Sequence, residues 1–196
     1  CLLSRGLGDV YKRQGFKDAL TGIYLKLGTT TLYAGDLTYA YLDELAGLYS
    51  DYPGYNTNAV FNQSIVFDYE NMFLSKKNGI YSTMYNIIAN INNFLEYVDK
   101  NKDVLVTERY YETMKGEALG LRAFLHFDLL RMFGPIYKEH PASKAIPYRT
   151  TFDKDATPVL SANEVVDAIL KDLNAAEKLL KESDPLHFFT DQMGEE

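Results

Sequence analysis

The sequence has little cysteine, no tryptophan and no long hydrophobic run. A single cysteine in 196 residues excludes a disulfide framework and a zinc site built from several thiolates. No uninterrupted apolar run approaches about 18 residues, which excludes a membrane-spanning helix of the usual kind. Lysine and arginine number 20 against 27 acidic residues. This acidic balance argues against a nucleic-acid-binding surface, which needs clustered basic side chains.

What remains is an ordinary soluble composition that is rich in tyrosine. Hydrophobic residues make up 46% and charged residues 24% of the chain, and both values argue against disorder of the whole chain. The length fits one domain or a piece of a larger protein. There are 16 tyrosines. Tyrosine combines a flat apolar face with a polar tip, which suits hydrated binding surfaces.

The first fourteen residues, CLLSRGLGDVYKRQ, resemble a translated sequencing-adapter tail. We therefore expect residues 1–14 to be non-native and to contribute nothing to the fold. Cys1 is then not expected to carry a lipid, because a lipidated cysteine follows an apolar segment and a small-residue cleavage site. The domain is expected to occupy residues 15–196.

Apolar residues recur at three- and four-residue spacing in four long segments. The pattern predicts helices over 15–27, 79–100, 107–133 and 162–181, and a shorter one over 37–48 that begins after Asp36. Ser161 and Glu164 fit a capping box at the start of the last helix, and Gly134 with Pro135 marks the end of the third. The centres of the second and third helices lie about 30 residues apart, near the period of tetratricopeptide arrays. The sequence thus predicts an all-helical, solenoid-like fold.

The helix expected over 107–133 is apolar nearly all round in its second half, so we predict that it is buried between other helices, with Phe127 in the core. Gly120 and Ala123 are expected to allow close helix approach. The polar residues on this helix allow two interpretations, a buried acid/base site or ion pairs to neighbouring helices, and we favour the ion pairs because buried charges need partners. These polar residues are Glu117, Arg122, His126, Asp128 and Arg131.

The sequence offers no convincing metal or catalytic motif. His126, His140 and His187 are not at ligand spacing. Residues 153–157, DKDAT, resemble the aspartate motif of haloacid-dehalogenase-like phosphatases, but polar residues precede them and no alternating strand–helix units surround them. We interpret this segment as a loop, and no cofactor is predicted.

One run is more specific than periodicity. Residues 115–135 read KGEALGLRAFLHFDLLRMFGP and closely resemble the signature helix of the SusD/RagB family of outer-membrane nutrient-binding lipoproteins of Bacteroidetes. Four further segments agree in order, over about residues 15 to 190. They are the FKDALTGIY run at 16–24, the helix with Tyr81, Tyr85, Ile88, Asn90 and Asn93, the AIPY run at 145–148, and the helix at 161–180.

The resemblance implies a tetratricopeptide-like (SusD-like α-α superhelix) all-α fold, here an N-terminal portion, and a binding protein that is not an enzyme. It also implies a lipid-anchored place on the outer-membrane surface, through an anchor absent from this fragment. The implied partner is a SusC-like TonB-dependent transporter, to which such proteins deliver glycans or peptides.

A tyrosine- and asparagine-rich segment is the candidate ligand site. Aromatic rings stack on sugar C–H faces, while amides and carboxylates pair with sugar hydroxyls, and binding residues concentrate on loops. The alternatives are that these tyrosines cover helices, that the chain is a protein–protein interaction module without a small-molecule ligand, or, more weakly, that Asp51 and Glu70 form a glycosidase pair. The candidate residues are Tyr49, Asp51, Tyr52, Tyr55, Asn56, Asn58 and Asn62.

Overall fold

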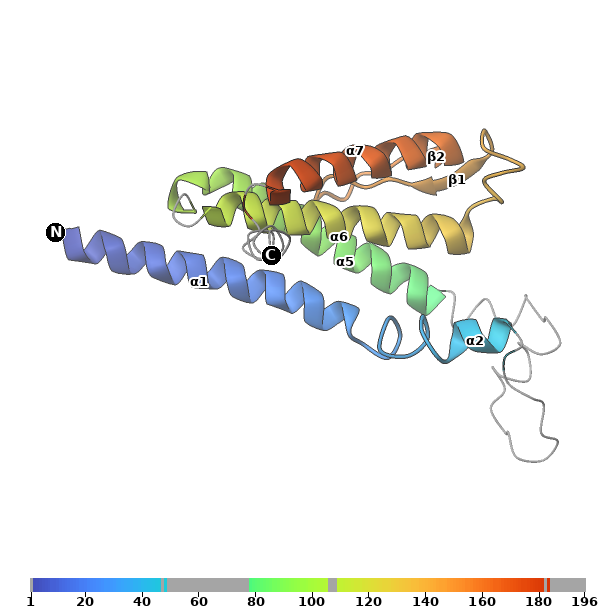
Figure 1. Ribbon diagram of the computed structural model, residues 1–196, viewed down its shortest axis with the longest axis horizontal. Helices are drawn as coiled ribbons and strands as arrows, with labels where there is room; N and C mark the ends of the chain where they lie inside the picture. The colour runs from blue at the N-terminus through green and yellow to red at the C-terminus, as the bar shows by residue number, and fades with distance from the viewer. Residues whose placement is uncertain (1, 47, 49–77, 106–108, 182, 184–196) are drawn as a thin grey trace, which may run out of the picture. The chain divides into compact units, whose positions relative to one another are not determined.

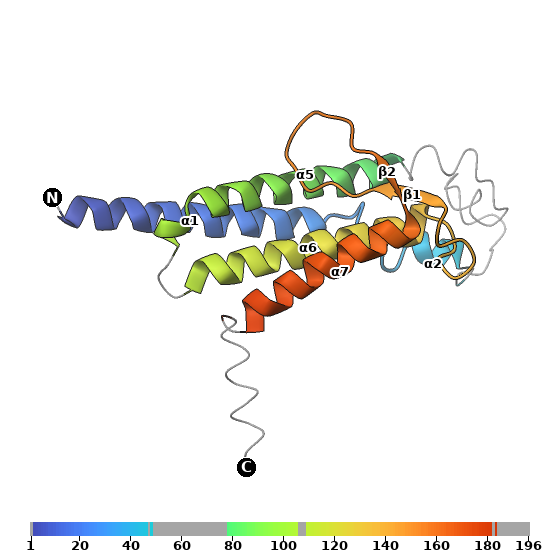
Figure 2. The same ribbon diagram turned by 90° about the horizontal axis from the view of Figure 1, so that it is seen from above.

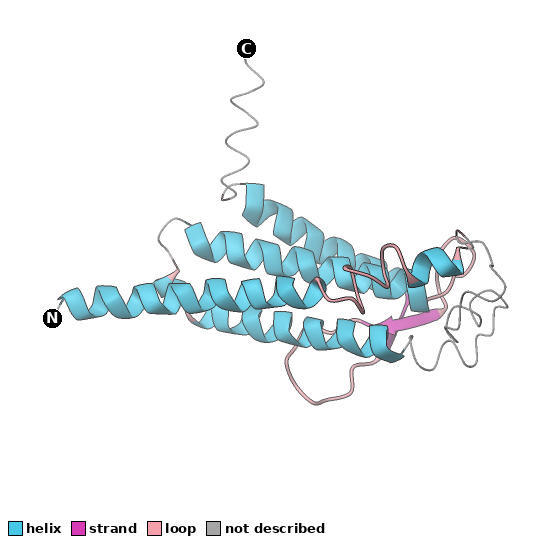
Figure 3. Cartoon of the chain, turned by 90° about the horizontal axis from the view of Figure 1, so that it is seen from below, coloured by secondary structure: helices cyan, strands magenta, loops and turns pink. Residues whose placement is uncertain are grey.

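The computed structural model describes residues 2–46, 48, 78–105, 109–181 and 183. Helices make up nearly all of the regular structure in these ranges (Figure 3). The elements are α1 (Leu2–Leu27), α2 (Tyr41–Leu45), α5 (Asn78–Lys100), the 3-10 helix η2 (Lys102–Val104), α6 (Tyr110–Phe133), β1 (Lys144–Pro147), β2 (Val159–Ser161) and α7 (Ala162–Lys181). The predicted helical fold class is confirmed, with one two-stranded sheet in the described part of the chain.

The chain divides into two compact units. One unit comprises residues 22–87, and the other comprises residues 1–21 and 88–196. The boundaries fall inside α1 and α5, so each of these helices contributes to both units.

In the unit of residues 22–87, the segment after α1 forms successive turns rather than the predicted helix from residue 37. Backbone hydrogen bonds from Asp36 N to Thr30 O (2.9 Å) and from Leu37 N to Leu32 O (2.9 Å) close these turns. A Cβ on Gly35 would lie 2.4 Å from the Thr30 carbonyl oxygen. The tight turns therefore need glycine at position 35. Because these turns come first, helix α2 begins at Tyr41 and not at residue 37.

Helix α5 matches its predicted pattern closely. Ser82, Asn86 and Glu96 are exposed, so the polar face points to solvent as expected. All the predicted stripe residues are buried, namely Ile80, Met84, Ile87, Ile88, Ile91, Phe94, Leu95 and Val98.

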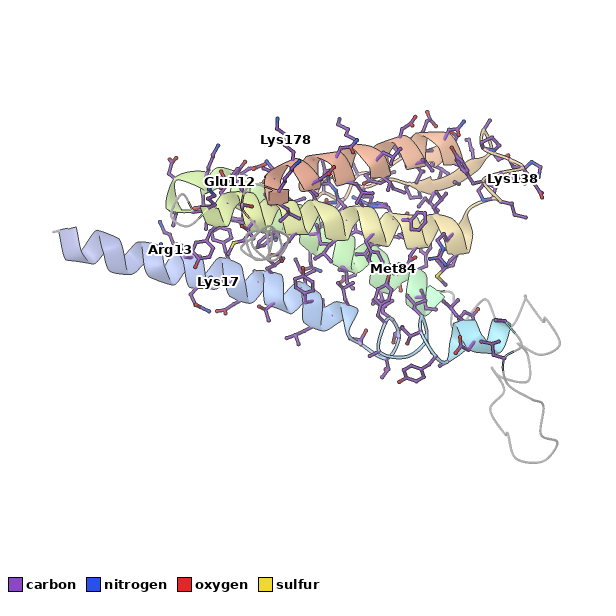
Figure 4. The ribbon with its side chains drawn as sticks, viewed as in Figure 1. Arg13, Lys17, Met84, Glu112, Lys138 and Lys178 are labelled. Carbon is purple, nitrogen blue, oxygen red and sulfur yellow. The ribbon has the colours of Figure 1, made fainter. Side chains whose placement is uncertain are left out.

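Helices α6 and α7 lie side by side in the second unit (Figures 1 and 2), and Lys178 projects from α7 away from α6 (Figure 4). Of the two glycines within α6, Gly116 is in the tighter contact with α7, since a Cβ there would lie 2.7 Å from Leu180 Cγ. At Gly120 the nearest atom would be Ala176 Cβ at 3.9 Å, an ordinary contact. The glycine that allows tight helix packing is therefore Gly116, one turn before the predicted Gly120.

The prediction that Phe127 lies in the core is wrong. Phe127 is 45% exposed, and the Arg131 guanidinium carbon lies 5.6 Å from the centre of its ring. The buried face of α6 instead contains Arg122 and His126. Because this helix is apolar on nearly all sides, we expected every side to be buried. Within the described residues, the neighbouring elements instead bury the face that contains Arg122 and His126, and Phe127 stays partly exposed to solvent.

In helix α7, too, a polar residue is buried where an apolar residue was expected. Val165, Ile169 and Ala176 are buried as predicted. Leu173, which lies one turn after Ile169 in the apolar spacing that predicted this helix, is 43% exposed, and Asp172 is buried instead. The four-, three- and four-residue steps through 165, 169, 172 and 176 follow the helical period, so the carboxylate occupies a core position of the stripe.

Strands β1 and β2 pair antiparallel, with Lys144 opposite Ser161 and Pro147 opposite Val159. The predicted capping box at the start of α7 is confirmed. Ser161 N donates to Glu164 Oε2 (2.8 Å), and Glu164 N donates to Ser161 Oγ (3.4 Å). Hydrogen bonds from the Ser161 side chain and backbone lower the pKa of Glu164.

At the N-terminus, α1 extends back to Leu2 and so includes most of the segment expected to be non-native. Residues just after that segment contact other elements. The Phe16 ring meets the edge of Phe94 with centroids 6.1 Å apart, and Lys17 Nζ donates to Tyr110 Oη at 2.9 Å (Figure 4). That residues 1–14 add nothing to stability stays a prediction.

The start of α6 differs from expectation. The predicted cap, Thr107, lies outside the described residues, and the residue that precedes the helix is Arg109 in a left-handed conformation (φ 56°). The helix ends at Phe133 before Gly134, as predicted.

The two mid-helix glycines of α6 give a matched test of the α6–α7 contact. We expect Gly120→Ala to stabilise the protein by about 0.5–1 kcal/mol, because alanine favours the helix and the added methyl group has room. Gly116→Ala should be destabilising, because the same methyl group collides with Leu180. Chemical denaturation measures both. Equal effects of the two substitutions would contradict the packing described.

Candidate functional site

All the predicted ligand-binding residues fall in 49–62 and lie outside the described residues, as does Glu70. Their role as a binding site therefore stays a prediction. The described part of the chain contains a different cluster of polar side chains, buried where α5, α6, α7 and the end of β1 meet. We call it the Arg122 network; its members are Asn92, Arg122, His126, Tyr148 and Asp172.

Arg122 on α6 and Asp172 on α7 form a two-pronged ion pair. Arg122 Nε donates to Asp172 Oδ2 at 2.7 Å, and Nη2 donates to Oδ1 at 2.8 Å. The side chains are only 9% and 10% exposed. Parallel hydrogen bonds of this type combine charge with fixed geometry, so they set the rotation of each helix relative to the other.

Asn92 extends the network to α5. Its Oδ1 accepts from Arg122 Nη1 at 3.0 Å. Its Nδ2 donates to the backbone oxygens of Arg149 (3.1 Å) and Thr151 (3.3 Å). One buried amide thus joins α5 to α6 and to the chain that leaves β1.

Tyr148 and His126 complete the network. Tyr148 Oη donates to Asp172 Oδ2 at 2.6 Å, and burial followed by this hydrogen bond raises the pKa of Tyr148. Its ring stacks on His126 with centroids 3.9 Å apart and an interplanar angle of 22°. Residue 148 is therefore attached to α6 by stacking and to α7 by a hydrogen bond.

His126 is held in one neutral form. The backbone N–H of Arg149 donates to Nε2 at 3.1 Å, so Nδ1 carries the hydrogen and donates to the Arg122 carbonyl oxygen at 2.8 Å. Burial lowers the pKa of His126 to about 4. The neighbouring Arg122 charge acts in the same direction, while Asp172 and the carbonyl partially oppose it.

The network is built to hold structure rather than to transfer protons. No buried side-chain nitrogen or oxygen in the described part of the chain lacks a hydrogen-bond partner, and both ring nitrogens of His126 are occupied. What the network does is attach the backbone of Tyr148, Arg149 and Thr151 to α5, α6 and α7. Our preferred interpretation, ion pairs to neighbouring helices, is confirmed for Arg122, whereas Asp128 and Arg131 pair with each other within α6.

Sequence reasoning named Arg122 and His126 but missed their partners. Asp172 could have been found, because it interrupts an apolar stripe at a core position. Asn92 is 2% exposed, yet its neighbours Asn90 and Asn93 were the ones singled out. Nothing in the local sequence marks Tyr148 as a partner of Asp172, since they meet only through the packing of β1 on α7.

The other motifs play minor parts. In residues 153–157 the phosphatase-like aspartate lies on an exposed loop, where Arg149 Nη2 donates to Asp153 Oδ1 at 3.1 Å. Among the residues that the structure describes, no three histidine, cysteine or acidic side chains are grouped to hold a metal. In the same ranges no helix has both the length and the apolar character needed to cross a membrane.

Two arginines of α6 test the energetic weight of the ion pair. Arg122→Met should cost about 3–5 kcal/mol, because Asp172 is left buried without its countercharge. Arg131→Met removes a 3.0 Å pair to Asp128 in which the arginine side chain is 63% exposed, and should cost less than about 1 kcal/mol. Chemical denaturation measures both. The double variant Arg122→Met/Asp172→Leu should recover part of the loss; no recovery would contradict a pairwise interaction.

His126 makes stability depend on pH. The unfolded chain takes up a proton near pH 6.5, but folded His126 does so only near pH 4. Stability is therefore lost as pH falls from 7 to 4, by about 3 kcal/mol from this group. We expect this loss in urea titrations of the wild type and of His140→Gln, whose histidine is exposed. It should be absent from His126→Gln, and an identical pH profile in that variant would refute the assignment.

Comparison with known proteins agrees with this architecture. Residues 18–191 match a SusD-like family described as starch-binding and associating with the outer membrane. A SusD-like protein P38 from Formosa agariphila is 44% identical over 75 residues, which cover 36% of this chain and 13% of that protein. A crystal structure of a SusD superfamily protein from Bacteroides thetaiotaomicron aligns with a TM-score of 0.66 at 19% identity, over 85% of this chain and 37% of that one.

The chain thus spans 37% of the length of the SusD superfamily protein, and its match to the Formosa protein covers 13% of that protein. The structural likeness, at low identity, concerns the fold, and it supports the tetratricopeptide-like helical class. The family match covers most of the chain and includes the whole Arg122 network. The chain therefore belongs to the SusD-like family.

Proposed function

We propose that this chain is part of a non-catalytic, cell-surface protein that binds glycans, or in some cases peptides, and delivers them to a SusC-like TonB-dependent transporter. The observation that carries the proposal is the family match over residues 18–191, whose description is starch-binding and associating with the outer membrane. A lipid anchor in the whole protein would hold it at the membrane.

The Arg122 network supports a binding role over a catalytic one. Its ionisable side chains are buried and fully engaged, so none can reach a substrate atom. Its hydrogen bonds instead hold connecting backbone in a fixed position. Rigid helices that present pre-positioned loops suit recognition, because little ordering remains to be done when the ligand binds.

Within the proposal, residues 49–62 supply ligand contacts. Tyrosine rings provide stacking faces, and asparagine and aspartate provide hydrogen-bonding groups. Contacts from the rest of the longer protein would add to them, so binding by this chain alone should be weak, about millimolar or −4 kcal/mol.

The test uses the full-length parent protein, titrated with oligosaccharides, starting with starch-derived ones, and with peptides by calorimetry. Tyr52→Ala, Tyr55→Ala and Asn58→Ala should each weaken binding without changing the melting temperature. Tyr137→Ala, a tyrosine 46% exposed after α6, is the matched control and should bind normally.

Two results would count against the proposal. Absence of binding to every saccharide and peptide, together with retained association with a protein partner, would favour the helical interaction module. Turnover of a bound saccharide would show an enzyme. Copurification of the parent with the transporter tests the delivery step separately.

A further inference from the structure

The connection between β1 and β2, residues 148–158, stands out among the described loops, because so much buried structure is devoted to holding it. It arches away from α6 and α7 in Figure 2, where it is the orange loop between the two strands. Its backbone is tied to the Arg122 network at Arg149 N, Arg149 O and Thr151 O. A loop that served only to join two short strands would not need these bonds.

The loop also holds itself in place. Arg149 Nη2 donates to the Asp153 backbone oxygen at 2.9 Å and to Oδ1 at 3.1 Å. Asp155 N donates to Asp153 Oδ1 at 3.1 Å, forming a turn that the aspartate side chain closes. Prolines at both ends, Pro147 and Pro158, restrict the backbone further. The middle of the loop is therefore pre-formed.

Between these fixed points lies Phe152, which is 54% exposed. A phenylalanine without a polar tip gains nothing from facing water, and burying an aromatic face would be favourable. Thr151 and Asp153 flank it, and Thr150 and Asp155 are exposed beside it. One flat apolar ring thus lies within a few residues of hydroxyl, carboxylate and guanidinium groups in a short loop.

From this arrangement we infer that residues 149–155 form a glycan subsite, in which Phe152 stacks on a sugar ring and Thr150, Asp153 and Arg149 contact its hydroxyls. The subsite is separate from the candidate segment at 49–62. The inference rests on the proposed function, since it names a second place where the same class of ligand binds.

The chemistry favours a neutral sugar. One arginine and one lysine in residues 149–155 are balanced by two aspartates, so the loop attracts neither anions nor cations strongly. A stable protein interface buries about 800 Å² on each partner, more than one short loop offers, whereas a single ring with a polar frame matches one or two sugar units.

The experiment follows chemical shifts of the 196-residue chain during titration with maltoheptaose, and retention on starch gels. Phe152→Ala should weaken binding about fivefold to tenfold, as expected for loss of a central aromatic contact. Phe152→Tyr keeps a stacking face and should bind within about twofold of the wild type. Phe127→Ala is the matched control, because it removes a phenylalanine of similar exposure from α6, and it should bind as the wild type does.

The outcomes separate the two proposals. Wild-type binding that Phe152→Ala leaves unchanged overturns the subsite and keeps the proposed function. If Phe152→Ala instead weakens only copurification with the transporter, the loop is a protein-docking surface and the subsite is again overturned. Failure of the wild type to bind maltoheptaose or starch contradicts the subsite; failure of the full-length parent on every saccharide and peptide contradicts the proposed function as well.

Discussion

The buried ion pair between Arg122 and Asp172 is the interaction on which the second unit depends. Two parallel hydrogen bonds hold the pair in one geometry, and Asn92 and Tyr148 add one further hydrogen bond each, to Arg122 and to Asp172. Removing charges from water is expensive, and the attraction between them repays that expense only when such geometry is satisfied. The pair therefore adds less to net stability than to the choice of one helix packing over others.

The network also explains how a helical scaffold holds a loop in place. Tyr148 stacks on His126, and Asn92 donates two hydrogen bonds to the backbone after β1. Through these contacts the packed helices fix where that backbone segment lies. In a family described as starch-binding and associating with the outer membrane, recognition has to come from surfaces that such a scaffold presents. In the proposed function, buried polar groups and exposed aromatic side chains are two parts of one arrangement: the first holds the backbone, and the second faces the ligand.

In α6 and α7 some apolar residues are exposed and some polar residues are buried, and both differences from the predicted core have one physical cause. Phe127 and Leu173 are partly exposed, whereas Arg122, His126 and Asp172 are buried. A hydrophobicity scale ranks each residue by the free energy of its transfer from water to an apolar medium. By that ranking, Phe127 and Leu173 should be buried and the three polar residues exposed, which is the opposite of what is found. Buried polar groups are tolerated when they are paired, and here Arg122 and Asp172 find partners on other elements, while His126 bonds to its own helix and to the backbone of Arg149. The local pattern does not show which groups pair with one another.

The sequence by itself determined the four long helices and several of their limits. Heptad-like spacing in α5, the capping box before α7 and the glycine–proline end of α6 act over a few residues, so they can be recognised without knowledge of the rest of the chain. The signature run of α6 likewise indicated the family. Tertiary structure alone decided that Gly116 rather than Gly120 packs tightly on α7, that Asn92 rather than Asn90 or Asn93 is buried, and that Tyr148 meets Asp172. These features depend on groups that lie 24 to 64 residues apart in the chain, and only packing of complete elements brings them within bonding distance.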